Sequence, residues 1–262
     1  METEQTGTLD CESQILKLGG HEFLISRPHD FGIVMDRPLE SGPVADDYLH
    51  QVLLRDDVRD CFLDIVDREG LVVCKNVRST ESSYRKVRGK SSHGKLSQAE
   101  YYHHDGCSCP VKPRVVEIRM PHQLISRNIA TAIAPFRSVM VAMLRALPAE
   151  ILVHGELQAT LDQFTCSPAD PPPCESWDRI QGRITRLVRR ELDAETCRAY
   201  FRRVDALASA YVEPWEMGES RLICNNHENL AKTMQHRRSY QAPRDSPEAN
   251  GSLVKRWTAE EL

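Results

Sequence analysis

The chain has 262 residues, of which 40% are hydrophobic and 27% are charged, which is enough to bury a substantial core in one domain. Its formal net charge of -4 gives no general reason to expect nucleic acid or an anionic membrane as a partner, so we expect a small soluble substrate. The sequence lacks an apolar run of about 18 residues and begins with a polar, acidic stretch, so we predict no membrane span, no secretory signal and a cytoplasmic location.

The first part of the chain is predicted to contain a tail, a helix, a strand and a loop. Residues 1–12 hold almost nothing apolar and are expected to form a disordered tail. Apolar residues then recur near helical spacing over 46–66, and Gly70 follows as a stop. Segment 70–77 has the β-branched run typical of a short buried strand. Residues from about 78 to 98 are rich in Ser, Lys, Arg and Gly, which predicts a mobile loop.

The middle of the chain is predicted to be mostly helical after one strand. Segment 113–120 alternates and is rich in β-branched residues, which indicates a strand. Helical spacing then runs over 125–147, interrupted at Pro135. A second strongly helical stretch covers 176–210. We therefore expect a helical insert at about 149–212.

Strand-like pieces return near the end of the chain. They cover 220–226, 234–240 and 251–258, and turn-forming residues separate them. The order is thus strands, then helices, then strands, which predicts a mixed α and β fold. We expect residues 13–262 to form a single domain.

A histidine and a carboxylate lie two residues apart, at His103 and Asp105. On an extended strand this spacing puts both side chains on one face, where they can bind the same ion. Two histidines and one carboxylate on one face of an octahedron form the ligand set of non-haem iron(II) oxygenases, and this set leaves positions open for other ligands. The third ligand has two late candidates, His227 and His236. We favour His236, because it follows a predicted strand and turn, whereas His227 lies in a predicted turn.

Six motifs between about residues 70 and 258 resemble those of the iron(II)/2-oxoglutarate dioxygenases of the taurine dioxygenase and clavaminate synthase type. In chain order they are Gly-Leu-Val-Val, Tyr-His-His-Asp-Gly, Pro-Arg-Val-Val-Glu, Trp-Glu-Met-Gly-Glu-Ser-Arg-Leu-Ile-Cys-Asn-Asn, Met-Gln-His-Arg-Arg and Leu-Val-Lys-Arg-Trp. The resemblance implies a double-stranded β-helix (jelly-roll, cupin-like) core with flanking helices and a helical insert. It also implies that His103, Asp105 and His236 are the metal ligands and the catalytic centre.

The same resemblance implies a reaction and its cofactors. The metal is Fe(II), 2-oxoglutarate is the cosubstrate, and O2 is the oxidant. Oxidation of an unactivated C–H bond, most often by hydroxylation, accompanies the conversion of 2-oxoglutarate to succinate, while desaturation and ring closure are alternative outcomes. Halogenation is disfavoured, because a halogenating member of the family lacks the carboxylate that Asp105 provides.

The resemblance also implies an arginine for the far carboxylate of 2-oxoglutarate, whose two oxygens match a guanidinium. The family often has an Arg-X-X-X-Arg pattern on the last core strand, but here the two positions are Ser252 and Arg256. Arg256 is the first candidate for the anchor, and Arg238 and Arg244 are alternatives. Thr131 resembles the family's secondary hydroxyl contact to 2-oxoglutarate.

The predicted loop before the first ligands carries five basic residues, where family members have a lid. We hypothesise that it closes over a substrate that bears a carboxylate, such as an amino acid or a natural-product intermediate. An exposed soluble loop is the alternative. The sequence does not decide whether the chain forms a homodimer. The basic residues are Arg85, Lys86, Arg88, Lys90 and Lys95.

Two other classes of function compete with an oxygenase. A zinc-binding protein could use His103, His104, Cys107 and Cys109, although no other cysteines form a close second pair. The nine cysteines are an odd number with irregular spacing, so we expect reduced thiols. The other alternative is a relative of the family that binds a ligand without catalysis.

Overall fold

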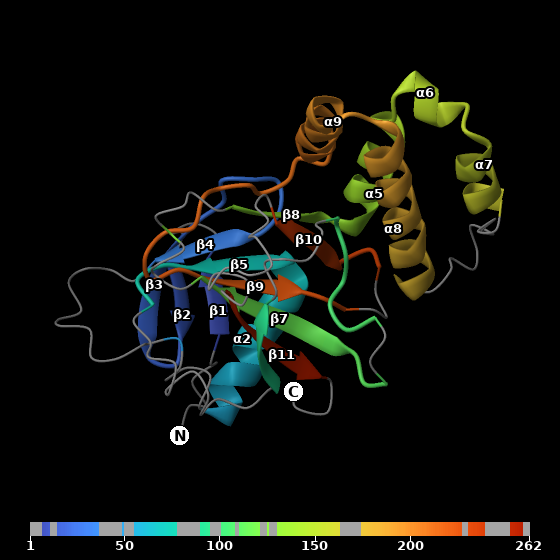
Figure 1. The fold of residues 1–262 in the computed structure, drawn as a ribbon. Coiled ribbons are helices and arrows are strands. Elements are labelled where there is room, and N and C mark those ends of the chain that lie inside the picture. Colours follow the sequence, from blue (N-terminus) through green and yellow to red (C-terminus); the bar gives the residue numbers. More distant parts are fainter. Residues whose placement is uncertain are drawn as a thin grey trace.

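The computed structural model describes residues 7–10, 15–36, 49, 55–77, 90–94, 101–107, 110–120, 125, 130–162, 174–226, 230–238 and 252–258. Within these ranges, 7–10, 90–94, 174–175, 238 and 252–258 are described by their backbone. The chain forms a large sheet, a small second sheet and a group of helices (Figure 1). The fold is therefore mixed α and β with a sheet-rich core, as the sequence predicts.

The large sheet has nine strands in the order β1-β2-β3-β4-β5-β9-β7-β11-β6. Neighbouring strands are antiparallel, except for the parallel pair β4 and β5. The strands are β1 (Gly7–Asp10), β2 (Ile15–Leu18), β3 (His21–Ser26), β4 (Ile33–Asp36), β5 (Leu71–Cys74), β6 (Lys90–Gly94), β7 (Pro113–Arg119), β9 (Ser220–Cys224) and β11 (Ser252–Thr258).

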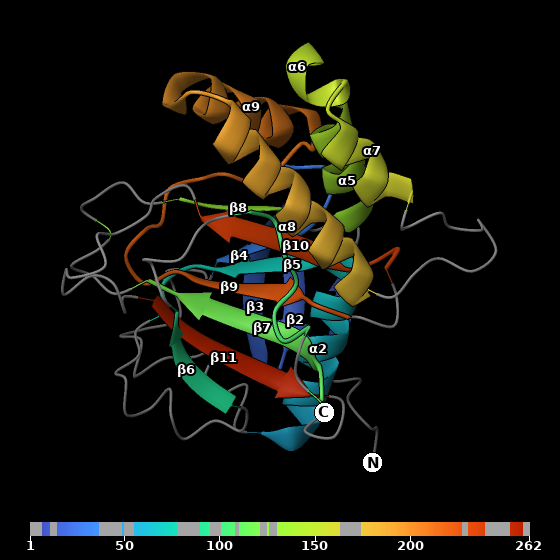
Figure 2. The same ribbon diagram turned by 45° about the vertical axis from the view of Figure 1, so that its right-hand side comes forward.

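The second sheet consists of two antiparallel strands, β8 (Thr131–Pro135) and β10 (Met234–Arg238). It lies beside β5 and β9 of the large sheet in both ribbon views, and the helices that lie between residues 136 and 207 gather on its other side (Figure 2). Single β-bridges extend it, and one of them pairs His103 with His236. The small sheet is thus a partition between the large sheet and the helices of residues 136–207.

Among the helices that the structure describes in full, α2 packs against the large sheet, and the others form the helical part. In α2 (Asp56–Glu69) the buried residues Val58, Phe62, Ile65 and Val66 recur at three to four residues and face the sheet core. The helix ends at Gly70, whose φ of 80° is in the left-handed region that glycine tolerates. The remaining helices are α5 (Phe136–Arg145), α6 (Ala149–Leu152), α7 (Gly155–Asp162), α8 (Cys174–Glu191) and α9 (Ala194–Leu207). No helix in the described ranges is both long and apolar enough to cross a membrane.

Two hydrophobic cores lie on the two sides of the partition. Because side chains alternate along a strand, Ile133 of β8 joins the core of the large sheet and α2, whereas Ala132 and Ala134 join the core of α5, α8 and α9. Tyr102 also belongs to the helical core. Both faces of the small sheet are therefore buried.

The predicted helix over 125–147 is wrong in its central part, where Thr131–Pro135 is strand β8 and the helix begins only at Phe136. Strand β8 pairs along its length with β10, about a hundred residues later in the chain, and this pairing overrides the Ala-rich local composition. Pro135 then serves as the residue before α5 rather than as an interruption.

Other boundaries also differ from the prediction. The helical stretch 176–210 is two helices, because the Asp193 side chain accepts from the N–H groups of Glu195 and Thr196 and starts α9. Gly7–Asp10 and Lys90–Gly94, which the sequence places in a tail and a loop, are strands paired with β2 and β11. No disulfide joins the described cysteines Cys61, Cys74, Cys107, Cys197 and Cys224.

Candidate metal centre

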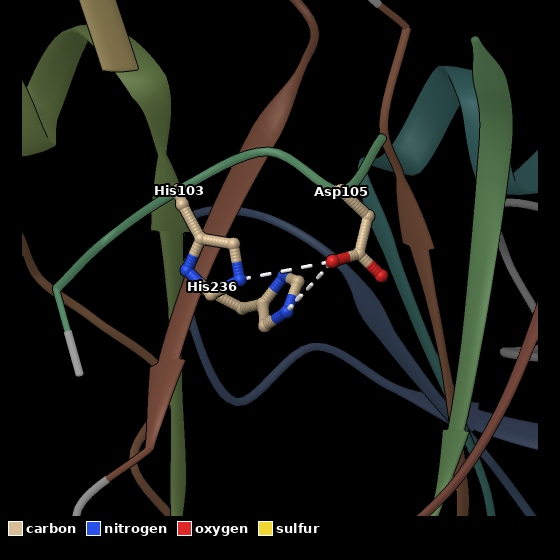
Figure 3. Close-up of side chains that lie close together, drawn as sticks. All are labelled: His103, Asp105 and His236. Carbon is tan, nitrogen blue, oxygen red and sulfur yellow. Dashed lines mark ion pairs between the residues drawn. The ribbon is translucent and has the colours of Figure 1, made fainter. Parts of the chain in front are cut away.

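Three side chains of metal-ligating type meet between the two sheets (Figure 3). The Nε2 atoms of His103 and His236 lie 3.7 Å and 3.9 Å from Oδ1 of Asp105. A first-row metal ion bonds nitrogen and oxygen at about 2.0–2.2 Å, so two ligands of one ion lie within about 4.4 Å of each other. Both distances to Asp105 are therefore short enough for one ion to bridge.

Backbone pairing places His103 next to His236. Each residue donates its N–H to the carbonyl of the other, and both N···O distances are 3.2 Å. The two imidazole centroids are 4.5 Å apart. Strand β10 thus carries one histidine and holds the other at its side.

Asn225, directly after β9, fixes the turn that carries Asp105. Its Oδ1 accepts the N–H of Asp105 at 2.9 Å, and its Nδ2 donates to the Asp105 carbonyl at 3.0 Å. The same Nδ2 donates to the carbonyl of Pro113 at 2.7 Å, where β7 begins. The carboxylate is therefore held from the large sheet, while the two histidines are held from the small one.

The hydrogen bonds of His103 determine which ring nitrogen can bind a metal. Its Nδ1 lies 2.8 Å from the carbonyl oxygen of Tyr101, and a carbonyl can only accept, so Nδ1 carries the proton. The lone pair of the neutral ring is then on Nε2, which is the atom nearest Asp105. Burial lowers the pKa of His103, but hydrogen bonding to Asp105 and the charge of that carboxylate outweigh it and raise the pKa above its usual value.

The three side chains are unequally exposed. His236 and Asp105 are 5% and 12% exposed, whereas His103 is 35% exposed. Two ligand positions are thus protected from water, and the third is open. The centre is therefore most exposed on the His103 side.

His104 takes part in a separate group. Its ring, the Cys107 thiol and the Asp178 carboxylate of α8 offer ligand-type atoms within 4.8 Å of one another. The Cys107 thiol donates to Asp178, and Gln235 Nε2 lies 3.0 Å from an Asp178 oxygen. Of the residues in the alternative zinc set, His103 and His104 thus lie in different groups, His104 and Cys107 lie in the same one, and Cys109 lies outside the described residues.

The predicted cosubstrate contacts fall at different places around the centre. Thr131 is the first residue of β8, and its Oγ1 accepts from Nε1 of Trp215 at 3.0 Å. Arg238 lies opposite Thr131 in the β8–β10 pair, two residues after His236, and Arg256 lies opposite the buried Val116 in the β11–β7 pair. Arg244 and His227 are outside the described residues.

An arginine that the sequence did not single out, Arg221 of β9, is buried next to Thr131. It donates to Glu219 and to the carbonyl oxygens of Thr131, Glu213 and Pro214, and its guanidinium lies 4.0 Å from the Trp215 ring centroid. These contacts hold the segment that contains Glu213 and Pro214, which precedes β9, against the large sheet. We assign Arg221 a structural role.

Comparison with known proteins finds similarity in structure and not in sequence. No protein-family model and no curated protein matches the chain. The chain is similar to AAD-2 in complex with Mn(II) and N-oxalylglycine, with a TM-score of 0.45, 12% identity, and coverage of 90% of this chain and 97% of that one. It is also similar to PvcB, named as an Fe, alpha-ketoglutarate dependent oxygenase from an isonitrile synthetic pathway, with a TM-score of 0.45, 10% identity, and coverage of 99% and 94%.

A taurine dioxygenase from Burkholderia xenovorans is a third structural neighbour, with a TM-score of 0.40, 12% identity and coverage of 90% of each chain. By their descriptions, these neighbours include an Fe, alpha-ketoglutarate dependent oxygenase and a taurine dioxygenase. Similarity at this level does not assign an activity to the chain. The functional proposal therefore rests on the residues of the site.

Proposed function

We propose that this chain is a mononuclear non-haem iron(II) oxygenase that uses 2-oxoglutarate and O2 to oxidise an unactivated C–H bond of a small molecule. The observation that carries the proposal is the meeting of His103 and Asp105 with His236, which is more than a hundred residues away in the chain. Two imidazoles and one carboxylate are the facial ligand set that leaves three metal positions open. One ion held in this way can accept a cosubstrate and dioxygen together.

The donor set fits iron(II) by its chemistry. His103 offers Nε2 because its Nδ1 is bonded to the Tyr101 carbonyl, and Asp105 offers Oδ1 toward both histidines. When bound, the iron would activate O2, which is the oxidant, and 2-oxoglutarate would supply two electrons; together 2-oxoglutarate and O2 give succinate, carbon dioxide and the one oxygen atom used on the substrate. The protein's own contribution is to hold the ligands, to shield His236 and Asp105 from water and to leave the His103 side open.

We also propose that the two sheets are the two faces of a double-stranded β-helix. Strands β8 and β10 form one face, and β5, β9, β7 and β11 of the large sheet form the other. The His103–His236 pairing and the Asp105–Asn225 bonds connect the centre to both faces. In this proposal residues 13–262 act as a single oxygenase domain, with 149–212 as its helical insert.

For the cosubstrate we propose Arg256 as the carboxylate anchor, with Arg238 as the second candidate and Thr131 as a hydroxyl contact. The Trp215 indole donates to Thr131 Oγ1, so in this proposal the hydroxyl hydrogen of Thr131 would donate to a carboxylate of 2-oxoglutarate. Substitution of the anchoring arginine by glutamine should raise the KM for 2-oxoglutarate more than tenfold. The same change at the other arginine should alter it little.

For the substrate we propose a small carboxylate-bearing molecule, such as an amino acid or a natural-product intermediate. The support is the cluster of basic residues at 85–95, which precedes the metal-binding segment in the sequence. Neutral replacement of the five basic residues should raise the KM for the substrate and leave that for 2-oxoglutarate unchanged. Hydroxylation is the expected outcome of the reaction.

The test is anaerobic reconstitution with iron(II) and 2-oxoglutarate, followed by admission of oxygen. We expect a weak visible charge-transfer band from the chelate, and then succinate. The His154→Ala variant is the matched control, because His154 lies in the helical insert and pairs with Glu191. Stoichiometric zinc without the band would favour a zinc protein, and 2-oxoglutarate binding without succinate in any substrate screen would favour a ligand-binding relative.

A further inference from the structure

The two segments that carry the candidate ligands turn alternate residues toward the helical insert. Tyr102 and His104 flank His103, while Gln235 and Arg237 flank His236. All four flanking side chains are buried, and each forms a polar contact with an aspartate of the insert. The metal-type side chains and these four therefore lie on opposite sides of the same backbone.

Asp205 of α9 contacts one residue from each segment. Tyr102 donates its hydroxyl to Asp205 Oδ1 at 2.6 Å, and Arg237 donates Nε to the same oxygen at 3.0 Å. A second guanidinium nitrogen of Arg237 donates to Asp205 Oδ2. The guanidinium also lies 5.6 Å from the ring centroids of Tyr102 and Phe201. One carboxylate thus joins the residue before His103 to the residue after His236.

Asp178 of α8 also contacts one residue from each of the two ligand-bearing segments, His104 and Gln235. It accepts the backbone N–H of His104 at 3.3 Å, and its Oδ1 lies 3.5 Å from the His104 ring nitrogen Nδ1. Gln235 donates Nε2 to the same Oδ1 at 3.0 Å. This second carboxylate therefore joins the residue after His103 to the residue before His236.

We propose that Asp178 and Asp205 are positioning residues of the metal centre, which clamp segment 101–105 in register on β10 from the side of the insert. The proposal rests on the proposed function for the identity of the ligands. Segment 101–105 pairs with β10 by one isolated bridge, with two backbone bonds of 3.2 Å. Since charge-assisted hydrogen bonds in a buried setting are stronger than neutral ones, the two carboxylates reinforce this single bridge.

The helical insert is then part of the support of the centre. Asn225 holds the Asp105 turn from the large sheet, and the two aspartates hold His103 against His236 from the insert. Loss of either aspartate should make the distance between the two histidines more variable without removing a ligand. Supporting groups of this kind change metal affinity by about 10- to 100-fold when they are removed.

The first experiment uses the metal-free chain and compares Asp205→Asn and Asp178→Asn with Asp193→Ala. Asp193 caps α9 and contacts Glu195 and Thr196, so its loss weakens the insert without touching the clamp. We expect hydrogen exchange of the His103 and His236 amides to be about tenfold faster in the two clamp variants, because these amides form the bridge. Exchange no faster than in Asp193→Ala would overturn the proposal.

The second experiment measures the affinity of the same variants for Mn(II). We expect Kd to rise at least tenfold in Asp205→Asn and Asp178→Asn and to stay within about twofold in Asp193→Ala. Unchanged Kd values in folded clamp variants would contradict the role. Removing one partner of a buried ion pair can prevent folding, so Tyr102→Phe is included. It keeps the ring and removes the hydroxyl together with its bond to Asp205, and faster exchange at the bridge is expected there too.

The two hypotheses fail in different ways. A wild-type chain that produces no succinate overturns the proposed oxygenase activity. The comparison of hydrogen-exchange rates then still tests whether Asp178 and Asp205 position the segment. A wild-type chain that produces succinate, with exchange and Mn(II) affinity unaffected in the clamp variants, overturns the clamp alone.

Discussion

The side-chain amide of Asn225 binds both backbone polar groups of Asp105, accepting from its N–H at 2.9 Å and donating to its carbonyl at 3.0 Å. These bonds fix the backbone of a turn residue from a position 120 residues later in the chain. The turn continues through Gly106, whose φ is 72°. The orientation of the carboxylate thus depends on an amide at the end of β9.

Replacement of Asn225 by alanine should weaken metal binding without removing a ligand. The Asp105 N–H and carbonyl would lose a buried partner, and the turn would gain freedom, so we expect Kd for Mn(II) to rise about 10- to 100-fold. The free energy of unfolding should fall by about 1–3 kcal/mol. Titration with Mn(II) and denaturant unfolding measure the two effects. Asn226→Ala is the control, since Asn226 contacts Asp67 of α2, and its Mn(II) affinity should stay near that of the wild type.

Loss of a candidate ligand should abolish stoichiometric metal binding. We expect His103→Ala and His236→Ala to bind less than a tenth of an equivalent of iron(II) under conditions that load the wild type fully, because two ligands remain in a set that needs three. Metal analysis after gel filtration is the measurement, and His154→Ala should bind one equivalent. If His227→Ala loses the metal while His236→Ala keeps it, the third ligand is assigned wrongly.

The glycine that precedes β4 should tolerate alanine poorly. Gly32 has a φ of 74°, and an added Cβ would meet the Leu71 side chain and carbonyl oxygen at 2.9 Å. Gly20, in the turn between β2 and β3, has a φ of 80°, and an added Cβ would meet no atom within 4 Å. Both changes incur the left-handed backbone cost of about 1 kcal/mol, and Gly32→Ala should lose about 1–3 kcal/mol more through overlap. Denaturant unfolding of the pair measures the difference; equal losses would contradict the steric account.

The ion pair between Arg114 of β7 and Asp67 of α2 should stabilise the fold in a pH-dependent way. Their closest atoms are 2.8 Å apart, and Arg114 is 34% exposed. Burial raises the pKa of Asp67, but the hydrogen bond to Arg114 and further contacts with Cys224 and Asn226 outweigh it and lower the pKa below 3.8. Because water screens a partly exposed pair, we expect Arg114→Gln to lose about 0.5–1 kcal/mol at pH 7.

The sign of the pH effect follows from the lowered pKa. The folded state holds the Asp67 proton less tightly than the unfolded state, so the pair stabilises the fold above the unfolded pKa of 3.8, and this stabilisation is lost as the pH falls through the lower folded pKa. The difference between Arg114→Gln and the wild type should therefore shrink as the pH falls below 3.8 and vanish once Asp67 is protonated in the folded state as well. Arg55→Gln, at a pair with both side chains more than half exposed, should change little across the same pH range.

Much of the fold was predictable, because its strands carry clear local patterns. The β-branched runs of β5 and β7 are strands in the structure, and so are the segment at 220–224 and the segments around His236 and Arg256. Strand β8 could not be predicted in the same way, since its Ala-rich segment is a strand only because β10 pairs with it. Local patterns do not contain such a distant partner.

For the candidate site too, the residues in a local pattern were predictable and those with distant partners were not. The two-residue spacing of His103 and Asp105 was visible in the sequence, whereas Asn225, Asp178 and Asp205 were not singled out, because their contacts join segments that are far apart in the chain. An Asn-Asn pair within a matching motif was the one available signal for Asn225. An aspartate on an otherwise charged helix gave no signal at all.

Strand β11 lies inside the large sheet, between β7 and β6 (Figure 2). During synthesis β6 and β7 are made long before β11, which pairs with both of them. The metal-binding segment after β6 is likewise made long before its partner strand β10. Contacts of such large sequence separation form late and slowly. We therefore expect the chain to reach its final fold only after these strands have left the ribosome, and to rely until then on helix α2 and the early strands for its order.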